Sequence, residues 1–344
     1  MMLKIEDKCA LPNSAALESE KMPYEIKVAG RKIVYEKYKQ LDGSNKVQVQ
    51  RVGGGNIVKR FDMTPFPRYN LDVVCPHFVE LKWAYGCPYK CAWCYLQGTL
   101  RMLKTKTAPV IKDYTEIAEH LDPFLLTKDP EMLNMGEVAD SLMGERRDFP
   151  FSSFIIPRFQ GTPHKALFLS KSDYVKNVLD MYGQENAVMS FTVNAPSVSK
   201  RWEKVAPSPD RRLRAARELA KRDYEVRLRV DPIVPIDGWK GEYKQLVRDI
   251  ADVGVERITL GTLRGLKSTI AHARDKSWTA FFENGDNSGW GKKMSVELRY
   301  ETYEYLLKEL ESAGIENVGV CKETIGMWKE LGLDYKKIKC NCTL

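Results

Sequence analysis

The chain has 344 residues, 43% of them hydrophobic and 29% charged, and its 54 basic and 46 acidic side chains give a formal net charge of +8. This composition is ordinary for a folded protein with a sizeable core, and it excludes a wholly disordered or fibrous chain. No run approaches the ~18 consecutive apolar residues of a membrane span. Residues 1–22 lack the apolar core of a secretory signal. We therefore expect a cytoplasmic protein with no membrane partner, whose modest positive charge permits a polyanionic partner without requiring one.

Residues 1–74 are expected to form an N-terminal extension with two short extended stretches, at 24–28 and 46–52. From about residue 75 the pattern becomes regular, and strands alternate with helices. The expected strands lie at 77–84, 131–135, 165–169, 188–193, 225–230, 257–260 and 318–321. The expected helices lie at 112–126, 174–181, 210–221, 241–252 and 296–312.

Alternation of strands with helices of ten or more residues is typical of parallel βα units. Six or seven such units predict an α/β fold of the partial (β/α)6 barrel type over residues 75–321, followed by a C-terminal segment at 322–344. In such a sheet the chemistry belongs at the C-terminal ends of the strands.

The eight cysteines are the most informative residues, because thiols in a cytoplasmic protein are more often metal ligands or reactive groups than disulfides. Cys87, Cys91 and Cys94 follow the first barrel strand at spacings of four and three, which can bring three thiolates toward one point. Soft thiolates suit zinc or iron–sulfur clusters. A structural zinc site needs four ligands, and no fourth Cys or His lies nearby in sequence. Three ligands leave one iron of a [4Fe-4S] cluster open to an external ligand.

This CxxxCxxC pattern resembles the signature of the radical S-adenosylmethionine (radical SAM) superfamily. The stretch Cys94-Tyr95-Leu96-Gln97-Gly98-Thr99-Leu100 resembles the spore photoproduct lyases, and further likeness at 168–173, 191–194 and 231–239 extends over roughly residues 75–320. The resemblance implies that the three cysteines hold three irons of a [4Fe-4S] cluster and that S-adenosylmethionine (AdoMet) binds the fourth. It also implies a one-electron reductant such as flavodoxin or ferredoxin, and cleavage of AdoMet to a 5′-deoxyadenosyl radical.

The same resemblance nominates residues at the strand ends as AdoMet contacts. Tyr95 is placed against the adenine, Glu137 or Asp140 against the amine, and Lys171 against the carboxylate. Further candidates at the ends of the fourth and fifth strands are Thr192, Asn194 and Arg229. Each has a structural alternative, such as a helix cap at 137–140, a solvated lysine at 171 or an ion pair in the barrel at 229.

Two departures separate the chain from the lyases. The lyases carry a hydrogen-donating Cys in the segment that corresponds to 134–141, whereas this chain has no Cys between 94 and 321. In addition, Trp93 stands where the lyases have a Tyr.

The C-terminus adds three cysteines, Cys321, Cys340 and Cys342. We expect them either to bind a second iron–sulfur cluster or to supply the missing hydrogen donor, with spectator thiols in a disordered tail as the alternative. No role is expected for Cys9 or Cys75.

The sequence therefore predicts a radical SAM enzyme that abstracts hydrogen from a pyrimidine nucleotide or DNA base, and then cleaves, rearranges or modifies it. A first alternative is an auxiliary-cluster enzyme that inserts sulfur into, or oxidises, a nucleoside-like metabolite. A second is a non-enzymatic metal-binding module for nucleic acid. Two basic segments could contact a nucleic acid backbone: the connection 264–293, in which aromatic residues alternate with basic ones, and an arginine-rich helix with Arg211, Arg212, Arg214 and Arg217. A solvated surface is the alternative for both.

Overall fold

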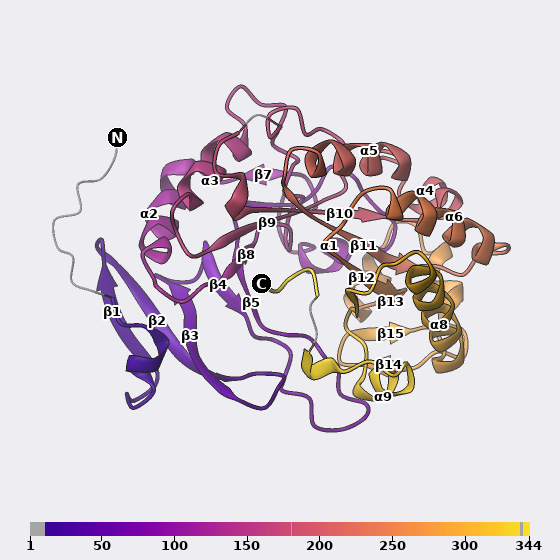
Figure 1. Ribbon diagram of the computed structural model, residues 1–344, viewed down its shortest axis with the longest axis horizontal. Helices are drawn as coiled ribbons and strands as arrows, with labels where there is room; N and C mark the ends of the chain where they lie inside the picture. The colour runs from indigo at the N-terminus through magenta and orange to yellow at the C-terminus, as the bar shows by residue number, and fades with distance from the viewer. Residues whose placement is uncertain (1–10, 180, 338–339) are drawn as a thin grey trace.

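One curved sheet organises the chain in the computed structural model, which describes residues 11–179, 181–337 and 340–344 (Figure 1). Within those residues the sheet has eleven strands, and seven consecutive ones pair in parallel. The seven are β5 (Phe78–Leu81), β8 (Met132–Asn134), β9 (Lys165–Ser170), β10 (Ala187–Val193), β11 (Glu225–Ile233), β12 (Arg257–Thr262) and β16 (Val318–Val320). The expected partial barrel of parallel strands is thereby confirmed.

The N-terminal extension continues this sheet at one edge. Its four antiparallel strands are β1 (Tyr24–Val28), β2 (Arg31–Lys39), β3 (Asn45–Val52) and β4 (Val58–Phe61), and β4 pairs antiparallel with β5. The sequence predicted only two of the four. Strand β2 escaped notice because a register shift at Val34 and Tyr35 breaks its alternation of buried and exposed side chains. A domain boundary near residue 74 stays a prediction.

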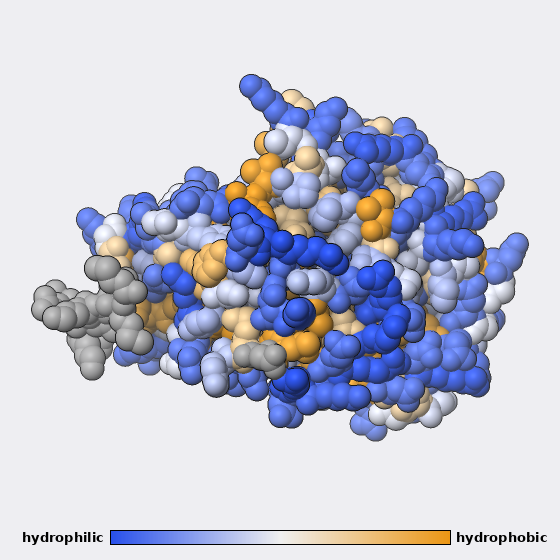
Figure 2. All heavy atoms as spheres, turned by 90° about the horizontal axis from the view of Figure 1, so that it is seen from above, coloured by the Kyte–Doolittle hydropathy of each residue, from blue (hydrophilic) through white to orange (hydrophobic). Residues whose placement is uncertain are grey.

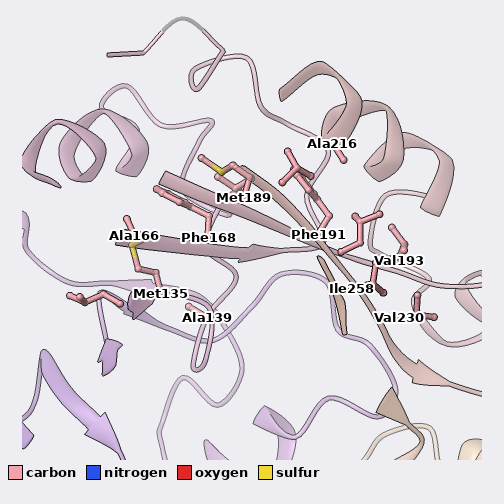
Figure 3. Close-up of a cluster of buried hydrophobic side chains, with 14 of the residues drawn as sticks. Met135, Ala139, Ala166, Phe168, Met189, Phe191, Val193, Ala216, Val230 and Ile258 are labelled. Atoms are coloured by element: carbon pink, nitrogen blue, oxygen red, sulfur yellow. The ribbon is translucent and has the colours of Figure 1, made fainter. Parts of the chain in front are cut away.

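Helices cover the outer face of the barrel strands (Figure 1). They are α2 (Tyr114–Leu125), α3 (Phe151–Phe159), α4 (Pro196–Trp202), α5 (Pro209–Ala220), α6 (Trp239–Ala251) and α8 (Val296–Ser312). Side chains of β10 alternate between the two faces of the sheet. Met189, Phe191 and Val193 join the hydrophobic core beneath α5 (Figure 3), whereas Ser190 and Thr192 face the barrel interior.

Short elements complete the connections. The short helices are α1 (Leu96–Thr99), α7 (Lys267–His272) and α9 (Ile325–Glu330), and the 3-10 turns lie at Ser14–Leu17, Gln184–Asn186, Ser277–Phe282 and Tyr335–Lys337. The short strands are β6 (Ala84–Tyr85), β7 (Val110–Ile111), β13 (Arg264–Gly265), β14 (Asn287–Ser288) and β15 (Gly291–Lys293). No described helix is both long enough and apolar enough to cross a bilayer. The face seen in Figure 2 is largely hydrophilic, with hydrophobic side chains in small groups.

The helix expected at 174–181 is wrong for the described residues of that range, because 176–179 form turns and 174, 175 and 181 have no regular secondary structure. Val175 and Val178 are buried, as the apolar pattern suggested. However, nearby side chains form hydrogen bonds in this segment that take the place of helical ones. The Ser172 hydroxyl accepts from the Tyr174 amide, and Asn177 donates to the Glu145 carbonyl. Hydrogen bonds of this kind stabilise turns at the expense of helix.

The C-terminal residues 340–344 fill the barrel interior, where Figure 1 shows the chain end at the centre of the curved sheet. Asn341 is 1% exposed and bonds three strands, donating to the Ser190 hydroxyl (2.8 Å) and the Leu228 carbonyl (2.9 Å) and accepting from the Thr259 hydroxyl (2.8 Å). Two buried arginines, Arg227 and Arg257, donate to tail carbonyls. The alternative of a disordered tail is therefore wrong for these residues.

Replacement of Asn341 by Ala should lower the free energy of unfolding by about 3 kcal/mol, because the Ser190, Thr259 and Leu228 groups lose buried partners. Urea unfolding followed by circular dichroism measures the change. Lys336→Ala, at an exposed residue near the tail, serves as the control and should change stability by under about 0.5 kcal/mol. A similarly small effect at Asn341 would mean that the tail is not part of the folded barrel.

Candidate active site

The loop after β6 carries the first group of cysteines and is held at both ends. Gly86 has φ +84°, and a Cβ there would lie 2.4 Å from the Ala108 carbonyl oxygen, so only glycine fits. The Cys87 amide donates to the Thr107 carbonyl (3.0 Å), and the Ala92 amide donates to the Trp202 carbonyl (2.8 Å). These bonds fix the loop between the 100–108 turn and the end of α4.

The thiols of Cys87, Cys91 and Cys94 line one cavity of about 260 Å³. Burial raises the pKa of all three thiols, that of Cys91 to about 12. No three His, Cys, Asp or Glu side chains in the described part of the chain already stand at metal-ligand geometry. The donor set still fits an iron–sulfur cluster, because three soft thiols share one cavity and lose their protons to a thiophilic metal.

The same cavity is walled by the C-terminal ends of the parallel strands. Six of the seven predicted AdoMet contacts line it: Tyr95, Glu137, Asp140, Lys171, Thr192 and Arg229. The seventh, Asn194, is not among the lining residues. Its amide is engaged by the Pro232 carbonyl, the Ala195 amide and the Tyr243 hydroxyl, so it holds the end of β10.

Two acidic residues after β8 occupy different environments. Asp140 accepts from the Ser170 hydroxyl (2.7 Å) and from the amides of Lys171 (2.8 Å) and Leu142 (3.1 Å), so its carboxylate ties the loop to β9. Glu137 lies near Tyr95, whose buried hydroxyl has no hydrogen-bond partner within the described residues. Burial, reinforced by the charge of Glu137, raises the pKa of Tyr95 well above its usual value. Of the two carboxylates, Glu137 is the one available to a ligand.

Lys171 belongs to a buried ion-pair network beside the cysteine loop. Its ammonium lies 3.5 Å from one carboxylate oxygen of Glu203, and Arg212 lies 2.7 Å from the other. Burial alone would raise the pKa of Glu203, but the two cations outweigh burial and lower it. Arg212 also donates to the Thr192 carbonyl (2.9 Å), so it is a structural residue and not part of a solvated helix face. The network holds Lys171 as a cation at the cavity wall.

The cavity wall also contains a second network, centred on Asp231. Arg264 donates to both carboxylate oxygens (3.0 and 2.9 Å), and Arg229 lies 3.3 Å from one of them. Burial opposes ionisation, yet the two guanidinium groups lower the pKa of Asp231 well below its usual range. The sequence did not single out Asp231 or Arg264, although Asp231 continues the alternating face of Arg227 and Arg229 along β11.

Four cysteines, Cys75, Cys321, Cys340 and Cys342, form a second group that we call the lower thiols. The Cys321 sulfur lies 3.4 Å from the Arg229 guanidinium and 3.7 Å from that of Arg264. The Cys342 sulfur lies 3.9 Å from the Asn134 amide nitrogen. A hydrogen bond with Cys340, supported by the charge of Arg229, holds the pKa of Cys342 at about 7. Because Arg229 and Glu137 act on Cys342 and also line the cavity, the lower thiols lie beneath its floor.

Cys75 was assigned no role from the sequence, but the structure places it with the lower thiols. The Val74 amide donates to the Glu323 carbonyl (2.7 Å), and Val73 bridges Thr324, which brings Cys75 alongside Cys321. Burial raises the pKa of Cys75 to about 12, with Cys321 and Cys342 contributing. The spacing of cysteines in the sequence could not reveal that Cys75 lies beside Cys321, because the pairing of 73–74 with 323–324 in the fold brings them together. Cys9 lies outside the described residues.

Comparison with known proteins identifies spore photoproduct lyases as similar in both sequence and fold. The family model described as spore photoproduct lyase matches residues 78–261. The spore photoproduct lyase of Bacillus subtilis (strain 168) is 28% identical over 171 residues, which is 48% of each chain. That of Geobacillus sp. (strain Y412MC61) is 26% identical over 247 residues, covering 68% of this chain and 69% of the relative. The match thus spans about half the length of the first relative and about two thirds of the second.

Solved structures extend the likeness to the fold. A spore photoproduct lyase complexed with dinucleoside spore photoproduct has a TM-score of 0.58 at 18% identity, over 74% of this chain and 80% of the other. A variant with bound AdoMet and dinucleoside spore photoproduct has a TM-score of 0.58 at 19% identity, over 75% and 81%. The barrel described above is therefore the fold of these structures.

Proposed function

Because this chain belongs to the spore photoproduct lyase family of radical SAM enzymes, we propose that it is a cytoplasmic radical SAM enzyme acting on a pyrimidine nucleotide or DNA base. The observation that carries the proposal is the single cavity that joins three thiols to charged side chains at the strand ends. When bound at these three thiols, a [4Fe-4S] cluster would supply the one-electron reduction that cleaves AdoMet and starts hydrogen abstraction from the substrate. A non-enzymatic module does not fit a family of enzymes.

The chain's own residues would hold these groups as follows. Cys87, Cys91 and Cys94 would hold the cluster through three irons and would leave the fourth for AdoMet. Glu137 accepts the amine of AdoMet in a charge-assisted bond, and Lys171, kept charged by Glu203, faces its carboxylate. Tyr95 offers its buried ring and hydroxyl to the adenine.

The four other predicted contacts act differently. Thr192 and Arg229 complete the wall of the cavity. Asn194 and Asp140 position the strand ends through their hydrogen bonds.

The far side of the cavity supports a nucleotide substrate. Trp290, from the long connection 264–293, lines it together with Arg264 and Lys322. The Lys322 ammonium lies 3.5 Å from the centre of the Trp290 ring. An aromatic face next to cations can stack a base and balance a phosphate. The related structures contain a dinucleoside spore photoproduct in complex, which agrees with this substrate class.

We assign the return of hydrogen to the product to the lower thiols. The chain has no Cys between 94 and 321, and Cys342 lies beneath the cavity floor beside Arg229. A thiol there can give its S–H hydrogen atom to a substrate-centred radical, which leaves a sulfur-centred radical on the tail.

Anaerobic reconstitution with iron and sulfide, followed by AdoMet and dithionite, tests the proposal. The parent should release 5′-deoxyadenosine, and Cys91→Ala should lose at least about 100-fold in this rate because its cluster loses one of three ligands. Thr343→Ala, which keeps every thiol, should stay within about twofold of the parent. Equal rates in the parent and Cys91→Ala would contradict the assignment of the cluster.

A second candidate function follows from the convergence of four lower thiols. They could hold an auxiliary iron–sulfur cluster, and the enzyme would then insert sulfur into, or oxidise, a nucleoside-like metabolite. Four thiolates would saturate a cluster, so it would relay electrons more readily than bind substrate.

Iron analysis separates the two roles of the lower thiols. An auxiliary cluster predicts about eight irons per chain in the parent and about four in the Cys75→Ala/Cys340→Ala/Cys342→Ala variant. The hydrogen-donor role predicts about four in both, with 5′-deoxyadenosine still formed by the variant. Acid-labile sulfide, measured on the same samples, checks the count.

A further inference from the structure

The cysteine loop has a second opening, on the side away from the Asp231 network. A smaller cavity of about 130 Å³ is lined by Cys87, Cys91 and Cys94. Its other walls come from the cysteine loop itself, α1, the end of α4 and the segment after α7. Apart from the three cysteines and Leu96, its lining shares no residue with the larger cavity, so it reaches the thiols without crossing the AdoMet and substrate walls.

Positive charge surrounds this opening. Four basic residues line it, and all four are exposed: Lys90, Arg201, Lys204 and Arg274. Within the described residues none of the four has a carboxylate within 4 Å. Asp275 is the one acidic side chain in the described lining. It accepts from the hydroxyl and amide of Ser277, and it also interacts electrostatically with Lys204 and Arg201, so it offsets part of the positive charge of the four cations. We call this surface the basic rim.

Several exposed cations on the outer helices are ion-paired instead. Arg214 pairs with Asp210 (2.9 Å), Lys240 with Glu301 (2.6 Å) and Lys244 with Glu309 (3.0 Å). Each of these three cations is neutralised by its own carboxylate, whereas the four cations of the basic rim share the single carboxylate of Asp275. An incompletely compensated patch beside an opening raises the local potential and steers an oppositely charged partner toward it.

We propose that the basic rim is the docking surface for an acidic protein that carries a one-electron donor, such as a flavin hydroquinone or a reduced iron–sulfur cluster. The inference rests on the proposed function, because it names the source of the electron. The donor is oxidised by one electron, which enters at the cysteine loop and is consumed in breaking the sulfonium carbon–sulfur bond of AdoMet. No proton or other co-reactant is required for this transfer.

The position of the rim suits electron entry better than nucleic acid binding. The rim surrounds the outer side of the three thiols, so a docked donor approaches the cluster ligands directly. Trp202 lies between the rim and the loop: Arg201 stacks 4.5 Å from its ring centre, and Trp93 lies 5.6 Å away. A nucleotide in the larger cavity is instead served by Arg264, Lys322 and Trp290, on a different wall.

Charge reversal tests the proposal. The Arg201→Glu/Lys204→Glu/Arg274→Glu variant leaves the cysteine loop and the larger cavity intact. The matched control is Lys27→Glu/Lys37→Glu/Lys128→Glu, which changes the net charge equally at exposed residues of β1, β2 and the turn after α2. The probes are a purified acidic flavodoxin and a purified acidic ferredoxin. The readouts are their Kd for each reconstituted protein at low and high salt, and the rate of 5′-deoxyadenosine release with each reductant.

The rim variant should bind the donor at least about tenfold more weakly at low salt, with the difference vanishing near 0.5 M salt, while the control stays within about twofold. Release of 5′-deoxyadenosine driven by the donor should fall in parallel. Release driven by dithionite should remain unchanged, because a small reductant needs no docking surface.

Three results would overturn the proposal. One is equal donor affinity in the parent and the rim variant. Another is a rim variant that loses affinity for a thymine oligonucleotide but not for the donors, which would assign the rim to nucleic acid. The third is a parent that binds neither donor while dithionite supports cleavage. If the parent released no 5′-deoxyadenosine with dithionite either, that result would instead reject the proposed function itself.

Discussion

The barrel depends on neutralising a row of charged side chains that β11 sends into its interior. Arg227, Arg229 and Asp231 stand on one face of this strand, at successive positions of a two-residue repeat. Removing the partner of a buried charge lowers the free energy of unfolding by about 3–5 kcal/mol, so each of the three charged groups needs a partner. Arg227 is met by Glu225 and by carbonyls of the C-terminal tail, and Asp231 is met by Arg264 and Arg229. Each of the charged side chains that β11 places in the interior therefore has a partner of opposite charge or a hydrogen-bond acceptor.

This constraint explains why the C-terminus belongs to the barrel. Asn341 satisfies polar groups on three strands, while the tail carbonyls accept from Arg227 and Arg257. Seating Asn341 in the barrel necessarily carries its neighbours Cys340 and Cys342 to the level of Arg229. One cysteine group thus lines the cavity and the other lies beneath it. For the proposed radical chemistry, a barrel interior filled from below by the tail would help to exclude solvent from reactive intermediates.

Much of this arrangement could be read from the sequence. The alternation of strands and helices predicted the parallel sheet, and the four-and-three spacing of cysteines predicted which loop carries the thiols. The local residue pattern could not reveal contacts between segments that are far apart in the sequence and meet only in the folded chain. Cys75 joins the lower thiols through pairing of 73–74 with 323–324, and Arg264 reaches Asp231 from a different strand end. Asn194 looked like a ligand because it follows a strand end, yet its amide nitrogen and oxygen are both engaged by its neighbours.

The most direct test is the dependence of 5′-deoxyadenosine release on substrate. The reconstituted protein would be given AdoMet, dithionite and, in parallel, no substrate, thymidine, a thymine dinucleotide, the dinucleoside spore photoproduct and irradiated DNA. We predict that one of the pyrimidine substrates raises the release at least about tenfold above the substrate-free rate, because binding commits the radical to productive abstraction. The same slow release with every compound, or no release at all, would contradict it.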